Sequence, residues 1–109
     1  MTDKKSYLGE FEQIVLLALV RLRNNAYGMT IRQEIEERAG RVVSIGAVYT
    51  TLERLEEKGL VSSRKGEATA ERGGRAKRYF KIETPGLRAL NESKRIFERM
   101  WSGVRPVGA

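Results

Sequence analysis

The chain has 109 residues, of which 40% are hydrophobic and 32% charged, a composition typical of one globular domain and too polar for a membrane protein. It contains no cysteine and no histidine, which excludes disulfides, thiolate or imidazole metal sites and histidine-based catalytic triads. Its 21 basic residues outnumber 14 acidic ones and give a net charge of +7, an excess that favours a polyanionic partner.

The first predicted helix carries apolar side chains at steps of three and four residues. They are Leu8, Phe11, Val15, Ala18 and Leu22. Ile14 and Leu17 widen this stripe, so we expect the helix to be buried on more than one side. The longest apolar run, residues 14–20, is far too short to cross a bilayer, and residues 1–6 lack the features of a secretory signal. We therefore expect a cytoplasmic protein with no membrane partner.

A second, shorter helix follows a turn made by Asn24, Asn25 and Gly28. Its apolar face is Ile31, Ile35 and Ala39, and Gly40 can terminate it in the left-handed conformation. Beyond Gly40, residues 41–43 are predicted to form a short strand.

Ser44 begins the third predicted helix, because its hydroxyl can cap the free amides of a helix that starts near Ile45. The inner stripe of this helix is Val48, Leu52 and Leu55. Gly59 is placed to stop the helix, with Leu60 folding back on the last turn.

After residue 59 the pattern predicts two strands, residues 60–64 and 76–82, joined by a polar segment, residues 66–75. Thr84-Pro85-Gly86 then predicts a helix start, with proline in the first helical position. The apolar residues of this last helix are Leu87, Leu90, Ile96, Phe97, Met100, Trp101 and Val104.

This order of three helices, a hairpin and a helix predicts a mostly α fold with a small β-hairpin, the winged helix-turn-helix. Residues 1–84 would form the winged-helix DNA-binding domain, and residues 85–109 a C-terminal dimerisation helix with a short frayed tail, in one compact unit. No metal site and no cofactor is expected.

Most of the net charge lies on the hairpin, where residues 62–81 contain seven basic and two acidic residues. Such a concentration suits displacement of counterions from a phosphate backbone. The basic residues expected to contact DNA from this wing are Arg64, Lys65, Arg72, Arg75, Lys77 and Arg78. Arg72 and Arg75 flank two glycines, as a minor-groove reader would need, although two glycines in a turn need no functional cause.

The third helix turns a small, polar N-terminal half outward, so that a DNA backbone can approach its free amides. The residues expected to contact DNA are Ser44, Gly46, Ala47, Tyr49, Thr50 and Arg54. For Tyr49 the alternative is a half-buried ring that packs against the hairpin. The acidic C-terminal half should stay outside the major groove.

The run from Ser44 to Val61, SIGAVYTTLERLEEKGLV, resembles the third helix of the PadR family of transcriptional regulators. Further matches are Leu8-Gly9, residues 14–19, Tyr27-Gly28, Arg78-Tyr79-Phe80 and residues 82–86. The resemblance implies a winged-helix homodimer that represses a nearby gene, with Tyr49 as the family's tyrosine of the recognition helix. Ile45 and Met29 depart from the family pattern, and the wing is long.

The apolar end of the last helix independently favours a dimer, since the first three helices already supply a core. By the resemblance, this helix packs against the partner's first helix. The residues expected at the dimer interface are Leu8, Phe11, Val15, Ile96, Phe97, Met100, Trp101 and Val104. Some relatives bind small aromatic compounds near the dimer centre, where Phe97 or Trp101 could stack on an effector; dimer packing is the alternative.

The sequence therefore predicts a sequence-specific, double-stranded DNA-binding repressor that acts as a homodimer on an inverted-repeat operator in the bacterial nucleoid. The alternative is a winged-helix adaptor that binds protein instead of DNA. No enzymatic activity is expected, because the glutamates lie mainly on exposed helical faces without groups that would perturb them.

Overall fold

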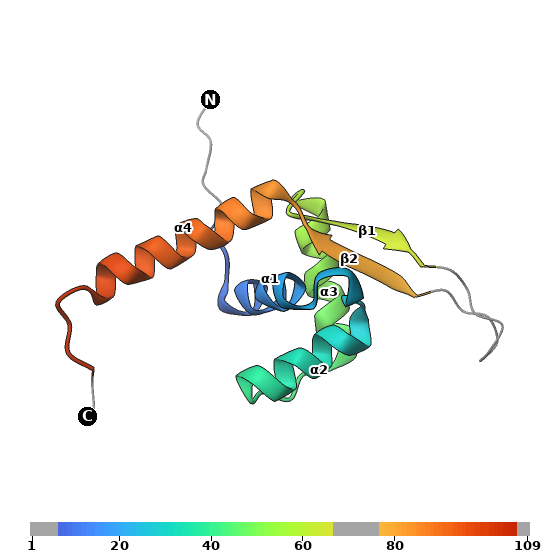
Figure 1. Cartoon of the computed structure of the whole chain (residues 1–109), viewed down its shortest axis with the longest axis horizontal. Coiled ribbons are helices and arrows are strands. Elements are labelled where there is room, and N and C mark those ends of the chain that lie inside the picture. The colour runs from blue at the N-terminus through green and yellow to red at the C-terminus, as the bar shows by residue number, and fades with distance from the viewer. Residues whose placement is uncertain (1–6, 67–76, 107–109) are drawn as a thin grey trace.

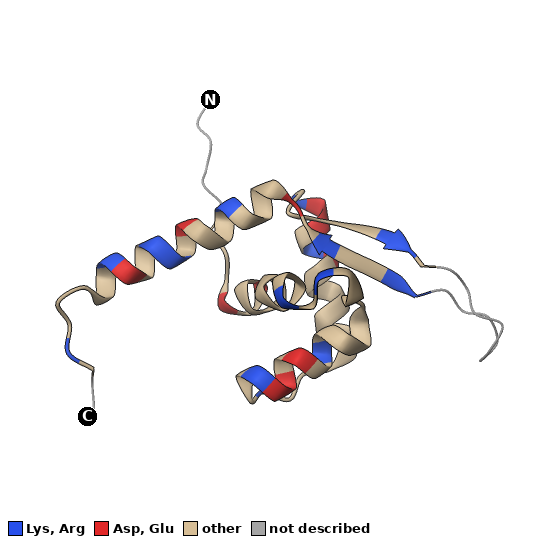
Figure 2. Cartoon of the chain, in the orientation of Figure 1, with Lys and Arg blue, Asp and Glu red and all other residues tan. Residues whose placement is uncertain are grey.

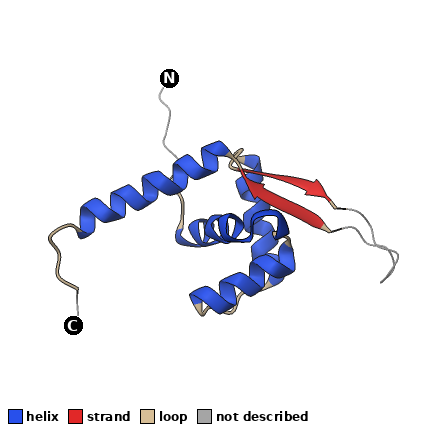
Figure 3. Ribbon diagram, viewed as in Figure 1, coloured by secondary structure: helices blue, strands red, loops and turns tan. Residues whose placement is uncertain are grey.

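The computed structural model describes residues 7–66 and 77–106 of the chain. The described elements, in chain order, are α1 (Glu10–Leu22), the short 3₁₀ turn η1 (Arg23–Asn25), α2 (Gly28–Ala39), α3 (Ile45–Glu57), β1 (Val61–Lys65), β2 (Arg78–Ile82) and α4 (Thr84–Trp101). Figures 1 and 3 show α1, α2 and α3 gathered into one body, with the hairpin leaving it on one side and α4 on the other. This is the predicted mostly α winged-helix fold.

The predicted helix ends depend on local signals that the structure confirms. The Ser44 hydroxyl accepts a hydrogen bond of 3.0 Å from the Ala47 amide and so caps α3. Gly40 ends α2 with a φ of 66°, and Gly59 follows α3 with a φ of 78°, a left-handed region that favours glycine. The Leu60 amide then donates to the Leu55 carbonyl at 3.0 Å, which turns the chain from α3 into β1.

One apolar core fills the space between the three helices and the inner face of the hairpin. Its buried side chains are Val15, Leu16, Ala18, Leu19, Ala26, Ile31, Ile35, Val48, Leu52, Leu55, Val61 and Phe80. The inner stripe predicted for α3 is therefore correct. On α1 the buried residues Val15, Leu16, Ala18 and Leu19 form one broad face, whereas Leu17, which was expected to widen the buried stripe, is 50% exposed.

The hairpin is antiparallel, with Ser63 opposite Phe80 and Arg64 opposite Tyr79. Because side chains alternate along a strand, Ser63 and Phe80 belong to the inner face of the hairpin, toward α3. Arg64 and Tyr79 belong to its outer face. A β-bridge between Tyr27 and Tyr79 attaches the start of α2 to the free edge of β2.

Several predicted elements differ from the structure, and the strands β1 and β2 begin one and two residues later than predicted. Residues 41–43 form no strand: Val42 is 89% exposed, Val43 packs against the core from the loop, and no strand within the described residues lies beside them to offer backbone partners. The helix α2 begins at Gly28, three residues before its first core side chain, because the Thr30 hydroxyl accepts from the Tyr27 amide at 3.0 Å. The helix α4 begins at Thr84 with Glu83 as its N-cap, so Pro85 is its second residue.

The start of α4 is held against the corner between α3 and β1. The Glu83 amide donates to the Leu60 carbonyl at 2.9 Å. Gly86 is buried, and a Cβ there would meet the same Leu60 carbonyl and lie 2.7 Å from Cγ1 of Ile82. This close approach sets the direction in which α4 leaves the body. Within the part of the chain that the structure describes, no helix is long and apolar enough to span a membrane.

The best-buried charge, Glu12 on α1, links α1 to the end of α3. Its side chain accepts from the Gly9 amide at 2.9 Å and from Lys58 Nζ at 3.0 Å. Burial raises the pKa of Glu12, but these hydrogen bonds and the charges of Lys58 and Arg54 outweigh it and hold the pKa below the ordinary 4.5.

A carboxyl whose pKa is lowered by folding contributes stability above its unfolded pKa, and this contribution is lost as the pH falls through the folded pKa. Glu12→Gln should therefore lower the free energy of unfolding by about 1–2 kcal/mol at pH 7. Its difference from the wild type should shrink below pH 4.5. Urea denaturation at several pH values measures this, with the exposed Glu10→Gln as control. A difference that is constant from pH 7 to pH 3 would contradict it.

Candidate nucleic-acid interface

The outward face of α3 carries a continuous stripe of exposed side chains. They are Gly46, Ala47, Thr50, Glu53, Arg54 and Glu57, which cover roughly a third of the helix circumference at 3.6 residues per turn. The first two turns of this stripe are small and uncharged. Ser44, just before the helix, is also exposed.

Five of the six α3 residues predicted to contact DNA therefore lie on the surface, and Tyr49 is the exception. Its half-buried ring lies with its centroid 6.4 Å from that of Phe80 on β2, as the packing alternative predicts. On its other side the ring covers Gly28, where an added Cβ would lie 2.7 and 2.8 Å from ring carbons of Tyr49. Tyr49 thus fixes α3 against the start of α2 and the base of the wing.

Gly28→Ala should destabilise the fold by about 1–3 kcal/mol, because the new methyl overpacks the slot that the Tyr49 ring occupies. The free energy of unfolding in urea measures the loss. The double variant Gly28→Ala, Tyr49→Leu should recover part of it, since the smaller side chain leaves room for the methyl. Strictly additive losses of the two single variants would refute this contact.

The wing adds a basic surface beside α3, and Figure 2 shows basic residues on both of its strands. Arg64, Lys65, Lys77 and Arg78 are all exposed. The predicted contacts Arg72 and Arg75 lie outside the described residues.

Arg78 has an internal role that its sequence position did not reveal. Its guanidinium donates to Oε1 of Glu56 at 2.8 Å and to the Ser63 hydroxyl at 3.1 Å. Ser63 in turn donates to Oε2 of Glu56 at 2.8 Å. This network joins β2 and β1 to α3, so the angle between the wing and α3 depends on it, and only part of the Arg78 charge remains for a partner.

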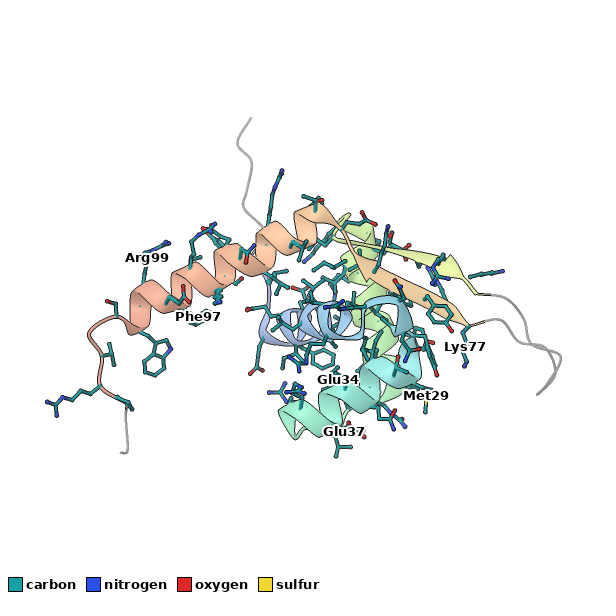
Figure 4. All side chains as sticks on the ribbon, in the orientation of Figure 1. Met29, Glu34, Glu37, Lys77, Phe97 and Arg99 are labelled. Carbon is teal, nitrogen blue, oxygen red and sulfur yellow. The ribbon has the colours of Figure 1, made fainter. Side chains whose placement is uncertain are left out.

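Aromatic rings hold two other wing cations in place. The Arg64 guanidinium lies 4.8 Å from the Tyr79 ring centroid, and Lys77 Nζ lies 4.5 Å from that of Tyr27. The two tyrosine rings meet edge to face with centroids 5.4 Å apart. Such contacts order a long cationic side chain while leaving its charge free, as a backbone-binding surface requires. Figure 4 places Lys77 where β2 begins.

Comparisons with known proteins agree on one family. The model of the transcriptional regulator PadR-like family matches residues 16–92, which include α2, α3, the wing and most of α1. The chain belongs to the PadR-like family of transcriptional regulators. It is 36% identical over 77 residues to the transcriptional regulator Rv3488 of Mycobacterium tuberculosis, covering 71% of this chain and 67% of that protein.

Solved structures of PadR-like proteins share the fold of this PadR-like regulator. A PadR-like transcription factor from Bacteroides fragilis superposes with a TM-score of 0.72 at 26% identity, covering 86% of this chain and 85% of the other. A PadR family regulator from Eggerthella lenta gives 0.66 at 27% identity, with coverage of 87% and 82%. These relatives are transcriptional regulators and not enzymes, so the protein is a DNA-binding transcriptional regulator.

The side chains predicted at the dimer interface of this PadR-like regulator lie in three different environments. Val15 has 0% exposure inside the core, so the structure contradicts its placement on an interface. Leu8, Phe11 and Ile96 are half-buried. Phe97, Met100, Trp101 and Val104 are 56, 71, 56 and 50% exposed, and Val104 lies beyond the end of α4.

The stripe rule that selected Val15 missed the apolar residues of α1 that do reach the surface. Leu17 is 50% exposed and Val20 is 40% exposed. Both line a hollow between α1 and α4, together with Phe97 and Trp101. Figure 4 shows Phe97 leaving α4 on the side opposite Arg99. The unbroken apolar run of residues 14–20 could have indicated these exposed residues. A helix with apolar residues on every side cannot bury all of them against one small core, so some must reach the surface.

Proposed function

We propose that this PadR-like regulator represses transcription as a homodimer that binds an inverted-repeat operator. The observation that carries the DNA-contact part of this proposal is the exposed first half of α3, where Gly46, Ala47 and Thr50 present no charge or bulk. A duplex backbone can approach the free amides of this helix start, and side chains of the first two turns can reach base edges in the major groove.

The wing would supply contacts that depend on charge and not on sequence. Arg64, Lys65 and Lys77 are exposed, and none of them has a carboxylate partner among the described residues. Cations in this state bind phosphates with little competition from the protein itself. The acidic residues Glu53 and Glu57 face outward on the second half of α3, so they would keep that end away from the duplex.

The dimer is supported by the exposed apolar residues of α4 and α1. Phe97, Met100 and Trp101 lie within a five-residue stretch of a helix whose outer side is charged. Large apolar patches on small proteins mark interfaces more often than bare surface. A second copy placing its α4 on Leu17 and Val20 of α1 would cover both sets of side chains.

Repression would follow from occupancy of a promoter in the cytoplasm, where the nucleoid lies. A small aromatic effector could relieve it by stacking on Phe97 or Trp101, because the hollow between α1 and α4 is bordered by these rings. Binding there would change the angle between the two copies and thus the spacing of the two α3 helices.

Footprinting on the intergenic DNA next to the gene, combined with sedimentation, tests this proposal. Two protected half-sites centred about 34 Å or a multiple of that apart, occupied by two chains, are expected from a two-fold dimer. Protection of a single half-site by one chain would contradict the dimer, and protection without sequence preference would contradict an operator.

A further inference from the structure

A basic hollow of about 410 Å³ lies between η1 and the hairpin, apart from the outward face of α3. Its lining includes Arg23, Asn24, Ser62, Arg64, Tyr79 and Lys81. The register pairs Ser62 with Lys81 and Arg64 with Tyr79. These four side chains therefore share the outer face of the hairpin, whereas α3 packs on its inner face.

The electrostatic balance of this hollow favours an anion. Arg23, Arg64 and Lys81 bring three cations from η1, β1 and β2 to one place. Among the described contacts of these residues, one involves a carboxylate. It belongs to Glu83, which lies 3.9 Å from Lys81 Nζ and accepts a hydrogen bond from the Ser62 hydroxyl. Arg64 has a ring contact and no ion pair there. The excess of two positive charges matches a phosphate group.

Arg23 is the second observation that points to a ligand. Its φ is 54° and its ψ is −118°, and it is the one residue other than glycine with positive φ in the described chain. Glycine adopts this conformation at far lower cost. Arg23 lines the hollow together with two further cationic residues, and strained residues cluster at binding sites, so its conformation points to a function for the side chain.

We propose that this hollow binds a phosphate group, with Arg23 as its principal ligand and Arg64 and Lys81 as partners. Asn24 also lines the hollow. The phosphate can belong to a small phosphate ester or to the DNA backbone as it passes the wing. Only binding of the DNA backbone depends on the proposed function. Binding of a small phosphate ester can be tested even if the protein binds no operator.

Titration of the full chain with sodium pyrophosphate, followed by the backbone amide NMR signals at constant ionic strength, tests the site. Saturable shifts centred on Arg23, Ser62 and Lys81 are expected, with affinity reduced at least tenfold in Arg23→Ala and Lys81→Gln. The matched control is Arg99→Ala, which removes an equal charge from the exposed side of α4 and should leave the affinity unchanged.

Arg23→Gly separates binding from folding. Glycine relieves the backbone at this position, so its Tm should be equal to or above that of the wild type, while pyrophosphate binding is lost. A loss of binding that merely follows a loss of Tm in all three variants would overturn the site.

Duplex binding distinguishes the two sources of phosphate. If the ligand is a free ester, pyrophosphate binding saturates and Arg23→Ala leaves the salt dependence of duplex binding unchanged. If the ligand is the DNA backbone, Arg23→Ala lowers the slope of log K against log salt by about 0.9. The absence of both effects, or equal effects in Arg99→Ala, would overturn the proposal.

Discussion

Trp101→Glu is expected to dissociate the proposed dimer and to weaken operator binding by about two to four orders of magnitude. The Trp101 side chain is 56% exposed in the single chain, beside the equally exposed Phe97. Burying an unpaired carboxylate in the interface with a second copy carries a desolvation free energy larger than the binding free energy that the interface provides. The loss of affinity follows because two joined half-sites bind far more tightly than one.

The same substitution should hardly alter the fold of a single chain, since Trp101 is the last residue of α4 and contributes nothing to the buried core. Arg105→Gln is the matched control: it changes the net charge by the same amount at an exposed position just beyond α4. Sedimentation and duplex binding measure both variants. A Trp101→Glu protein that stays dimeric at micromolar concentration would show that the interface lies elsewhere.

Ala47→Glu is expected to weaken duplex binding by about a hundredfold or more while leaving the Tm unchanged or higher. The site is exposed in the first turn of α3, and the Ala47 amide already bonds the Ser44 hydroxyl. A glutamate three residues after the N-cap completes a capping box and interacts favourably with the helix dipole, so the helix gains stability. The same carboxylate would face the phosphates of DNA at close range.

Ala47→Glu is informative because it should lower the affinity for DNA without lowering the Tm. A variant with a damaged fold would lose both. Asn91→Asp changes the charge equally on α4, at another exposed site, and should lose at most severalfold in affinity. Duplex binding by fluorescence anisotropy and thermal denaturation give the two readouts. Unchanged DNA affinity in Ala47→Glu would exclude the first turn of α3 from the interface.

The features that could be predicted from the sequence are those fixed by neighbours along the chain. Ser44 caps α3 with its own hydroxyl, and Gly40 and Gly59 supply left-handed turns within two residues of the helices they end. The inner stripe of α3 followed from helical periodicity alone. Each of these signals is complete within a few residues.

Features that depend on contacts between residues far apart in the sequence could not be predicted from local signals. Arg78 was expected to contact DNA, but its guanidinium also donates a hydrogen bond to Glu56, 22 positions earlier. For Tyr49 the sequence left two positions open, on the recognition surface or packed against the hairpin, and the contacts with Gly28 and Phe80 decide for packing. Residues 41–43 have a strand composition but form a loop, because no described strand lies beside them to pair with.

The prediction of which α1 residues reach the surface was wrong for a different reason. An apolar run carries no mark of which members face the core, so Val15 was assigned to an interface and Leu17 was not. The direction of α4, set where Gly86 lies against Leu60, decides which side of α1 remains open.

A salt titration of binding to a duplex from upstream of the gene, beside a scrambled duplex of equal length, tests the central claim that α3 reads sequence while the wing supplies charge. Tighter binding to the native duplex, with log K falling steeply against log salt for both, is the predicted result. Equal affinity for the two duplexes at every salt concentration, or no binding at low salt, would contradict it.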